Sequence, residues 1–307
     1  MYLEHFHLRE KPFSITPDTS YFFQHRAHQE ALNVLLVSLQ CGEGFIKITG
    51  EVGTGKTLLC RKLLNSLADD PEYVTAYIPN PNLTPAGLHV ALADELQLDC
   101  SSRLGQHKTL KLINERLIAL AAEGKRVVLC IDEAQAMPQA TMETLRLLSN
   151  LETEKSKLLH IVMFGQPELD RELAHPGIRQ LRQRITFSHQ LKPLDKRGVH
   201  DYVRHRLIIA GYAGEQLFSP AACDVLYKKS AGIPRLVNIL ANKAMLLAYG
   251  KGLQCVKPTH VRAAAVDTNE TGTQQRHFPF GQLFRLFAST ASLLLVVGLT
   301  VYAERLI

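Results

Sequence analysis

Along the first two thirds of the chain, two hydrophobic periods alternate. Short continuous apolar runs bounded by polar turns predict buried strands, and apolar residues spaced three or four apart predict helices. The predicted strands are 45–49, 73–78, 127–131, 158–164 and 185–189. The predicted helices are 28–39, 58–64, 84–96, 106–122 and 139–151. This alternation predicts an α/β fold with a parallel sheet, right-handed crossovers and helices on both faces.

Beyond Pro193 the strand-like runs cease. Helical patterns follow at 196–210, 220–230, 234–249 and 258–266, separated by turns that contain glycine. We therefore expect an α/β domain at 1–192, a second, all-helical domain at 193–268, called the helical lid below, and a polar linker at 269–285.

A long uncharged stretch follows the predicted linker. Residues 286–303 contain no charged side chain and lie between Arg285 and Glu304. As a helix, eighteen residues span about 27 Å, close to the thickness of the bilayer core. The stretch predicts a single transmembrane helix, with a buried C-terminal helix as the alternative. No apolar run follows Met1, so we expect no signal peptide.

Composition narrows the function classes only modestly. The net charge is +6 and the pI is near 9.0, which suits nucleotide phosphates, nucleic acid or an anionic membrane surface. The six cysteines form no C-x-x-C pair, and the thirteen histidines show no metal-ligand spacing. Disulfides and a thiolate metal site are therefore disfavoured, and a reducing cytosol is expected.

The strongest motif is a glycine-rich loop between a predicted strand and a predicted helix. Residues 50–57 read Gly-Glu-Val-Gly-Thr-Gly-Lys-Thr, the spacing of a phosphate-binding loop. Backbone N–H groups of such a loop and the start of the next helix bind phosphates. Lys56 is expected to reach the β and γ phosphates, and Thr57 to bind Mg²⁺. A glycine turn that only caps the helix is the alternative. The candidate nucleotide-binding residues are Gly50, Glu51, Val52, Gly53, Thr54, Gly55, Lys56, Thr57 and Leu58.

An acidic pair follows the apolar strand 127–131. Asp132 is expected to hold Mg²⁺, and Glu133 to act as general base toward the attacking water. Two carboxylates capping the next helix are the alternative. Gln166 follows the next predicted strand and is a candidate to orient the water. Asn80, at the end of the strand 73–78, is a weaker candidate to hold Glu133 in an idle rotamer.

Arginines mark two further candidate positions. Arg182 and Arg184 precede the last predicted strand, and either could reach the γ phosphate of a neighbouring subunit, with Arg184 preferred. A solvated basic helix face is the alternative. Arg235 lies at the start of a lid helix. A cation at that end interacts unfavourably with the helix dipole, and a role in binding phosphate would explain why an arginine stands there.

These motifs occur in the order of the Walker A, Walker B, sensor 1, arginine finger and sensor 2 elements, so the chain resembles AAA+ ATPases. Its opening, residues 6–18, resembles the ExeA-type secretion ATPases and, most closely, the MshM-like ATPases of mannose-sensitive haemagglutinin (MSHA) pilus biogenesis. The resemblance covers about residues 1–270. It implies hydrolysis of ATP with Mg²⁺ by Lys56, Thr57, Asp132 and Glu133. Under the same resemblance, Gln166 and Arg235 sense the γ phosphate.

The resemblance also implies partners and a location. It implies a homo-oligomer, for which a ring is one arrangement, working with pilus or secretion assembly proteins at the bacterial inner membrane. The basic flank of Arg276 and Arg285, against Arg305 on the other side of the uncharged stretch, favours an ATPase domain in the cytoplasm. The longer secretion relatives carry a periplasmic peptidoglycan-binding domain after the membrane helix. Here only residues 304–307 follow, so direct cell-wall binding is not expected.

Three functions compete. The first is a membrane-anchored AAA+ ATPase supporting assembly of a type IV, MSHA-like pilus or a type II secretion machine. The second is a DNA-associated regulator of the transposition-helper type, against which the membrane helix argues, so nucleic acid is not the expected partner. The third is a scaffold that binds ATP without turnover, which the presence of Glu133 disfavours.

Overall fold

The computed structural model describes residues 1–99, 105–152 and 157–271 of the 307-residue chain. The chain divides into two compact units, Met1–Ala265 and Val266–Ile307. The fold described below belongs to the first unit. The predicted transmembrane helix 286–303 and most of the predicted linker lie outside the described residues. Among the helices that are described, none is long and apolar enough to cross a bilayer.

A five-stranded parallel sheet forms the centre of the α/β domain, in the order β2-β3-β4-β1-β5. The strands are β1 (Phe45–Gly50), β2 (Tyr73–Ile78), β3 (Arg126–Ile131), β4 (Leu159–Gly165) and β5 (Phe187–Leu191). All five were predicted, and β5 begins two residues after the predicted start. This edge strand alternates exposed and covered residues, so its hydrophobic run marks its ends poorly.

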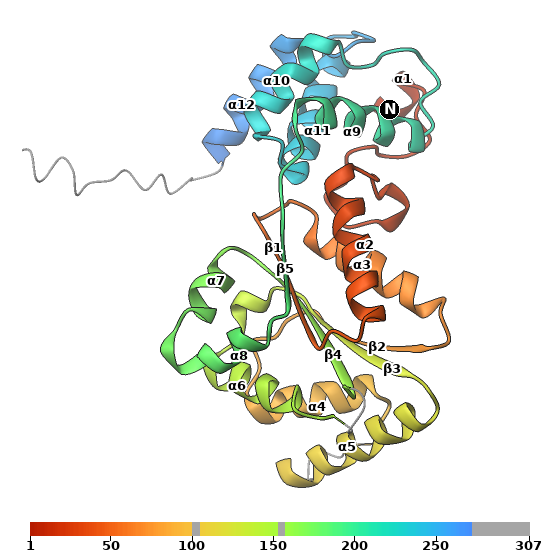
Figure 1. Ribbon diagram of the computed structural model, residues 1–307. Helices are drawn as coiled ribbons and strands as arrows, with labels where there is room; N and C mark the ends of the chain where they lie inside the picture. Colours follow the sequence, from red (N-terminus) through yellow and green to blue (C-terminus); the bar gives the residue numbers. More distant parts are fainter. Residues whose placement is uncertain (100–104, 153–156, 272–307) are drawn as a thin grey trace, which may run out of the picture. The chain divides into compact units, whose positions relative to one another are not determined.

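Helices cover both faces of the sheet, as predicted (Figure 1). On one face lie α2 (Arg26–Gln40) and α3 (Lys56–Ala68); on the other lie α4 (Pro85–Glu95), α5 (Gln106–Ala122) and α6 (Gln139–Leu148). Alternate residues of β3 enter the two cores: Leu129 packs on the second face and Cys130 on the first. Two short helices, α7 (Glu168–Leu173) and α8 (Arg179–Arg184), are too short for periodicity to reveal.

The lid is all-helical, as expected. It contains α9 (Lys196–Ile209), α10 (Pro220–Ser230), α11 (Pro234–Gly250) and α12 (Pro258–Thr271). Ser219 caps α10 by accepting from the N–H of Ala222, and Pro220 fits the first turn because that position needs no N–H donor. The predicted end of the last helix near residue 266, and the linker start at 269, were too early. No glycine or proline interrupts the sequence between Pro258 and Gly272, and the helix continues to Thr271.

The N-terminal segment packs with the lid. A short helix α1 (Tyr2–His5) opens the chain, and a 3₁₀ turn η1 covers Thr19–Tyr21. Phe6 and Phe13 are buried in the core of the lid. The N–H of Arg9 donates to the carbonyl of Ala210 at 2.8 Å, which ties the segment to the end of α9.

One glycine makes possible the close approach between the lid and the segment that leads into it. Gly232 has φ +75°, and a Cβ there would lie 1.9 Å from the carbonyl oxygen of Leu194. The carbonyl of Gly232 in turn accepts from the N–H of Leu194 at 2.9 Å. Only glycine combines this backbone conformation with this contact.

We predict that Gly232→Ala destabilises the chain. The left-handed conformation alone costs about 1–3 kcal/mol for a residue with a Cβ, and the clash with Leu194 adds to that. Gly252→Ala is the matched control, because Gly252 has φ +64° in the same domain, but a Cβ there would meet no atom of the described residues within 4 Å. Thermal denaturation should show the larger loss for Gly232→Ala. Equal losses would mean that the contact with Leu194 is unimportant.

Candidate nucleotide site

The glycine-rich loop has the backbone that phosphate binding requires. It connects the end of β1 at Gly50 to the start of α3 at Lys56. Gly53 and Gly55 have φ of +81° and +101°, conformations that side chains with a Cβ rarely adopt. A Cβ on Gly53 would also lie 2.6 Å from the Cβ of Arg235, so the loop and the lid meet at this residue. The prediction of a strand, a loop and a helix here is confirmed.

Lys56 is buried inside this loop, with 5% of its surface exposed. Its Nζ donates to the carbonyl of Gly50 at 2.8 Å and to that of Glu51 at 3.0 Å. Burial lowers the pKa of the ammonium, and the nearby carboxylates of Glu133 and Asp132 act in the opposite direction. The side chain thus places a cation within the loop that phosphate oxygens would enter.

Asp132 lies at the carboxyl end of β3 and is 3% exposed. It accepts a hydrogen bond from the Thr57 side chain, and its Oδ1 accepts from the N–H of Glu133 at 2.9 Å. Burial raises the pKa of this carboxyl, with those hydrogen bonds opposing the change. A carboxylate beside a hydroxyl is an oxygen donor set that suits Mg²⁺. The two residues predicted to hold the ion are therefore adjacent, and they fit it.

Glu133 has an unusual backbone for a residue with a Cβ, with φ 50° and ψ 38°. Its Oε2 accepts from the side-chain amides of Gln135 at 2.6 Å and Gln166 at 3.1 Å. Gln166, the candidate to orient the water, thus lies beside Glu133, and the sequence analysis missed Gln135. Asn80 Oδ1 accepts from the N–H of Asn82 at 3.2 Å, and the idle-rotamer role of Asn80 stays a prediction.

A cleft of about 320 Å³ joins most of the predicted site residues. Five chemical groups from distant parts of the sequence line it: Lys56, Thr57, Glu133, Gln166 and Arg235. The same cleft is lined by Val52, Gly53, Gly55 and Leu58 of the predicted set. Gly50, Glu51, Thr54, Asp132, Arg182 and Arg184 are not among its lining residues. The structure thus brings the loop, the acidic strand end and the lid arginine to one place.

Another part of the cleft wall comes from the N-terminal segment and from the lid. Residues 14–18 line it together with Tyr202, Arg206 and Asn238 of the lid. Arg206 donates to the hydroxyl of Tyr202 at 2.9 Å, and that hydroxyl donates to Asn238 Oδ1 at 3.0 Å. Asn238 Nδ2 completes the network by donating to the carbonyl of Ser14 at 3.2 Å. These bonds fasten the N-terminal segment to the lid, and no local sequence signal marks them.

The arginine candidates lie away from the cleft of their own chain. Arg184 is half-buried and donates from Nη1 to the carbonyl and Oγ of Ser149, each at 3.3 Å. Arg182 is exposed. The helix α8 that carries both residues is short and basic.

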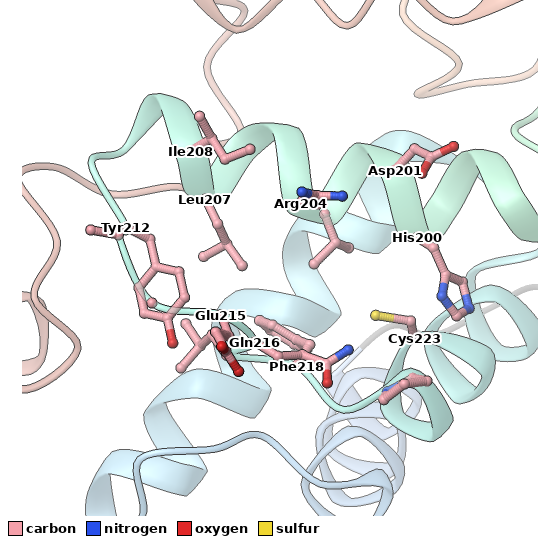
Figure 2. A pocket seen from close by; sticks show the side chains of 15 residues that line it. His200, Asp201, Arg204, Leu207, Ile208, Tyr212, Glu215, Gln216, Phe218 and Cys223 are labelled. Carbon is pink, nitrogen blue, oxygen red and sulfur yellow. The ribbon is translucent and has the colours of Figure 1, made fainter.

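A larger cavity of about 510 Å³ lies elsewhere, within the lid (Figure 2). Its lining comes from α9, from α10 and from the connection between them. Figure 2 shows the apolar side chains of Leu207, Tyr212 and Phe218 with Arg204 and Cys223 around it. None of the predicted site residues lines this cavity, so we do not assign the chemistry to it.

His28 connects the loop to α2. It is buried, and its Nε2 donates to the carbonyl of Thr54 at 2.9 Å, while its Nδ1 is buried without a hydrogen-bond partner in the described residues. A Cβ on Gly55 would lie 3.1 Å from Nε2. Burial lowers the pKa of this imidazole, because a proton on Nδ1 would have no acceptor.

Comparison with known proteins supports a nucleotide-binding ATPase domain. Residues 40–173 match the model of the AAA domain family. The chain is 43% identical over 278 residues to general secretion pathway protein A of Aeromonas hydrophila, covering 90% of this chain and 50% of that protein. It thus spans about half the length of this curated relative.

Solved structures share the fold at low identity. Cdc6p of Pyrobaculum aerophilum aligns with a TM-score of 0.64 and 18% identity, covering 81% of this chain and 70% of that one. The ORC2 protein of Aeropyrum pernix, in ADPNP and ADP complexes, aligns with a TM-score of 0.59 and 15% identity, covering 82% of this chain and 72% of that one. The RuvB branch migration motor of Thermotoga maritima aligns with a TM-score of 0.53 and 16% identity, covering 83% of this chain and 72% of that one. These similarities confirm the α/β fold of a parallel sheet flanked by helices.

The buried histidine makes stability depend on pH. Because the folded-state pKa of His28 lies below its unfolded value near 6.5, the unfolded chain binds the proton more tightly. Stability should be complete above about pH 6.5 and fall as the pH drops below that value. We predict that the melting temperature of His28→Gln falls less than that of wild type when the pH is lowered from 7.5 to 5.5. His107→Gln, at an exposed position, is the control and should retain the wild-type loss. An unchanged loss in His28→Gln would contradict the assignment.

Proposed function

This chain belongs to the AAA ATPases of the general secretion pathway protein A type, and we propose that it hydrolyses Mg·ATP to support assembly of a membrane-spanning secretion or pilus machine. The observation that carries the proposal is the convergence of Lys56, Thr57, Glu133, Gln166 and Arg235 on one cleft. Two domains supply these groups. A glycine turn that only caps a helix would not require them to meet.

The residues divide the work of phosphoryl transfer. The N–H groups of the loop and of the first turn of α3 bind the β and γ phosphates. Lys56 exchanges its bonds to the carbonyls of Gly50 and Glu51 for phosphate oxygens. Thr57 and Asp132 would hold Mg²⁺, which when bound would supply positive charge beside those oxygens.

Glu133 and the two sensing residues complete the site. Glu133 accepts the proton of the attacking water, and Gln166, already in contact with Glu133, orients that water. Arg235 reaches the γ phosphate from the lid. Its backbone N–H donates to the carbonyl of Gly53 at 3.2 Å, so the lid is held against the loop. Loss of the γ phosphate therefore changes a contact between two domains.

Binding and hydrolysis should separate in two variants. Lys56→Ala removes a charged donor, so the affinity for Mg·ATP should fall about 10- to 100-fold. Glu133→Gln keeps the shape but removes the base, so kcat should fall on the order of 10²-fold or more while the affinity is retained. Nucleotide titration and phosphate release measure the two effects, and Lys108→Ala, at an exposed position outside the cleft, should match wild type in both. Unchanged turnover in Glu133→Gln would remove the base assignment.

We further propose that the chain works as a homo-oligomer, in which Arg184 of one subunit completes the site of the next. The support is that neither Arg184 nor Arg182 lines the cleft of its own chain. An arginine supplied in trans contributes about 10³–10⁵ in rate and makes hydrolysis depend on assembly.

Mixing two inactive variants tests this sharing of sites. Glu133→Gln retains Arg184, and Arg184→Ala retains Glu133, so about a quarter of the head-to-tail interfaces in an equal random mixture contain both intact groups. We predict that each variant alone has little turnover and that the mixture recovers a substantial part of it. Arg179→Ala, on the same helix, is the control and should remain active. A mixture no more active than its components would mean that Arg184 does not act across subunits.

Membrane attachment and partners rest on sequence. The uncharged residues 286–303 support a single-pass anchor in the bacterial inner membrane, and Arg276 and Arg285 support a cytoplasmic ATPase domain. The relation to general secretion pathway protein A supports type II secretion proteins as partners, and the opening segment supports MSHA-like pilus proteins.

The net charge of +6 supports the DNA-associated alternative, and one solved neighbour in fold is the Aeropyrum pernix ORC1 protein in complex with DNA. That neighbour is 19% identical to this chain, so the similarity shows a shared fold and nothing more. Salt-dependent DNA binding would favour this alternative.

A further inference from the structure

A second glutamine, Gln135, lies between the proposed base Glu133 and Gln166, the residue that follows β4. Gln135 sits in the 3₁₀ turn η2 (Ala134–Ala136), directly after the acidic pair. Its Nε2 donates to Oε2 of Glu133 at 2.6 Å, and its Oε1 accepts from the backbone N–H of Gln166 at 2.9 Å. One side chain therefore bridges Glu133 to the end of β4.

The chemistry of the partners fixes the direction of both bonds. An ionised carboxylate only accepts, and a backbone N–H only donates. The amide of Gln135 can satisfy both groups only with its NH₂ toward Glu133 and its oxygen toward Gln166. A Cβ on residue 165 would lie 3.3 Å from that oxygen, so Gly165 leaves room for the bridge.

We propose that Gln135 is a positioning residue for the hydrolysis reaction, an inference that rests on the proposed ATPase function. Gln135 does not line the cleft, whereas Glu133 does, so Gln135 acts through the carboxylate of that base. Both amides bond to Oε2 of Glu133, which leaves Oε1 available to accept from water. The bridge also makes the position of the carboxylate follow the N–H of Gln166. A shift of that segment on nucleotide binding is then transmitted to the base.

The turn that carries Gln135 does not need the side chain in order to fold. The N–H of Ala136 donates to the carbonyl of Glu133 at 2.8 Å, and the N–H of Met137 donates to that of Ala134 at 3.2 Å. Ala134 and Met137 are buried in the core and anchor the turn. The Gln135 side chain is half-buried, and both of its hydrogen bonds go to groups at the proposed site, on Glu133 and Gln166. These contacts indicate a role in orientation more than in stability.

Two substitutions separate the two bonds. Gln135→Glu keeps an acceptor for the N–H of Gln166 but replaces the donor to Glu133 with an oxygen that repels it. Gln135→Ala removes both bonds. Gln139→Ala is the matched control, because Gln139 is an exposed glutamine at the start of α6 and does not line the cleft. For each variant of the full chain, kcat, KM for ATP, the affinity for Mg·ATP and the melting temperature are measured.

We expect kcat to fall on the order of tenfold in Gln135→Ala and further in Gln135→Glu, since a misplaced catalytic group can cost about 10²-fold. KM, Mg·ATP affinity and melting temperature should stay near the wild-type values, and Gln139→Ala should match wild type throughout. In a Glu133→Gln background, Gln135→Ala should cause no further loss, because Gln135 acts only through the base.

Several results would overturn the assignment. These are a wild-type kcat in both variants, a weakened Mg·ATP affinity that accounts for the loss of turnover, or a further loss in the Glu133→Gln background. If Gln135→Ala fails to fold, the near-isosteric Gln135→Glu decides by the same criteria. Wild-type protein that binds Mg·ATP but releases no phosphate would overturn the proposed function itself, and active wild type with unaffected variants would overturn this inference alone.

Discussion

The arrangement depends on a buried lysine held close to two carboxylates at one edge of a parallel sheet. Lys56 is almost fully enclosed, and burial works against its charge while Glu133 and Asp132 work in its favour. A buried ammonium of this kind is stable only where acceptors surround it, and the carbonyls of Gly50 and Glu51 provide them. Phosphate oxygens are stronger acceptors for a charged donor than these carbonyls, so the loop is ready to exchange one set for the other.

Strand order explains why the carboxylates and Gln166 meet this lysine. Because β4 lies between β3 and β1, the carboxyl ends of these three parallel strands meet at one edge. Asp132 and Glu133 follow β3, Gln166 follows β4, and the loop follows β1. The bridge through Gln135 joins two of these strand ends directly. The lid closes the arrangement from outside the sheet, since α11 meets the loop at Gly53 and the Arg206 network holds the N-terminal segment along the same cleft. Residues of both domains therefore line one cleft.

The sequence was sufficient where the signal is local. The central strands are buried on both faces, so their hydrophobic runs are continuous, and the loop glycines with Lys56 and Thr57 follow one another along the chain. The sequence was insufficient where tertiary packing decides the bounds of an element or the neighbours of a side chain. The edge strand β5 is half-exposed, and α7 and α8 are shorter than two turns of helix. Gln135 could have been suspected only from its place two residues after Glu133, and the part of the cleft wall formed by residues 14–18 depends on packing against the lid.

The most direct test of this account is an experimental structure of the full chain with Mg²⁺ and a non-hydrolysable ATP analogue. The account predicts the β and γ phosphates inside the loop of residues 50–57 and the ion beside Thr57 and Asp132. It also predicts that Nζ of Lys56 has moved from the carbonyls of Gly50 and Glu51 to the phosphates. Nucleotide bound elsewhere, for example in the lid cavity, or a Lys56 that keeps both carbonyl bonds with the analogue in place, would contradict it.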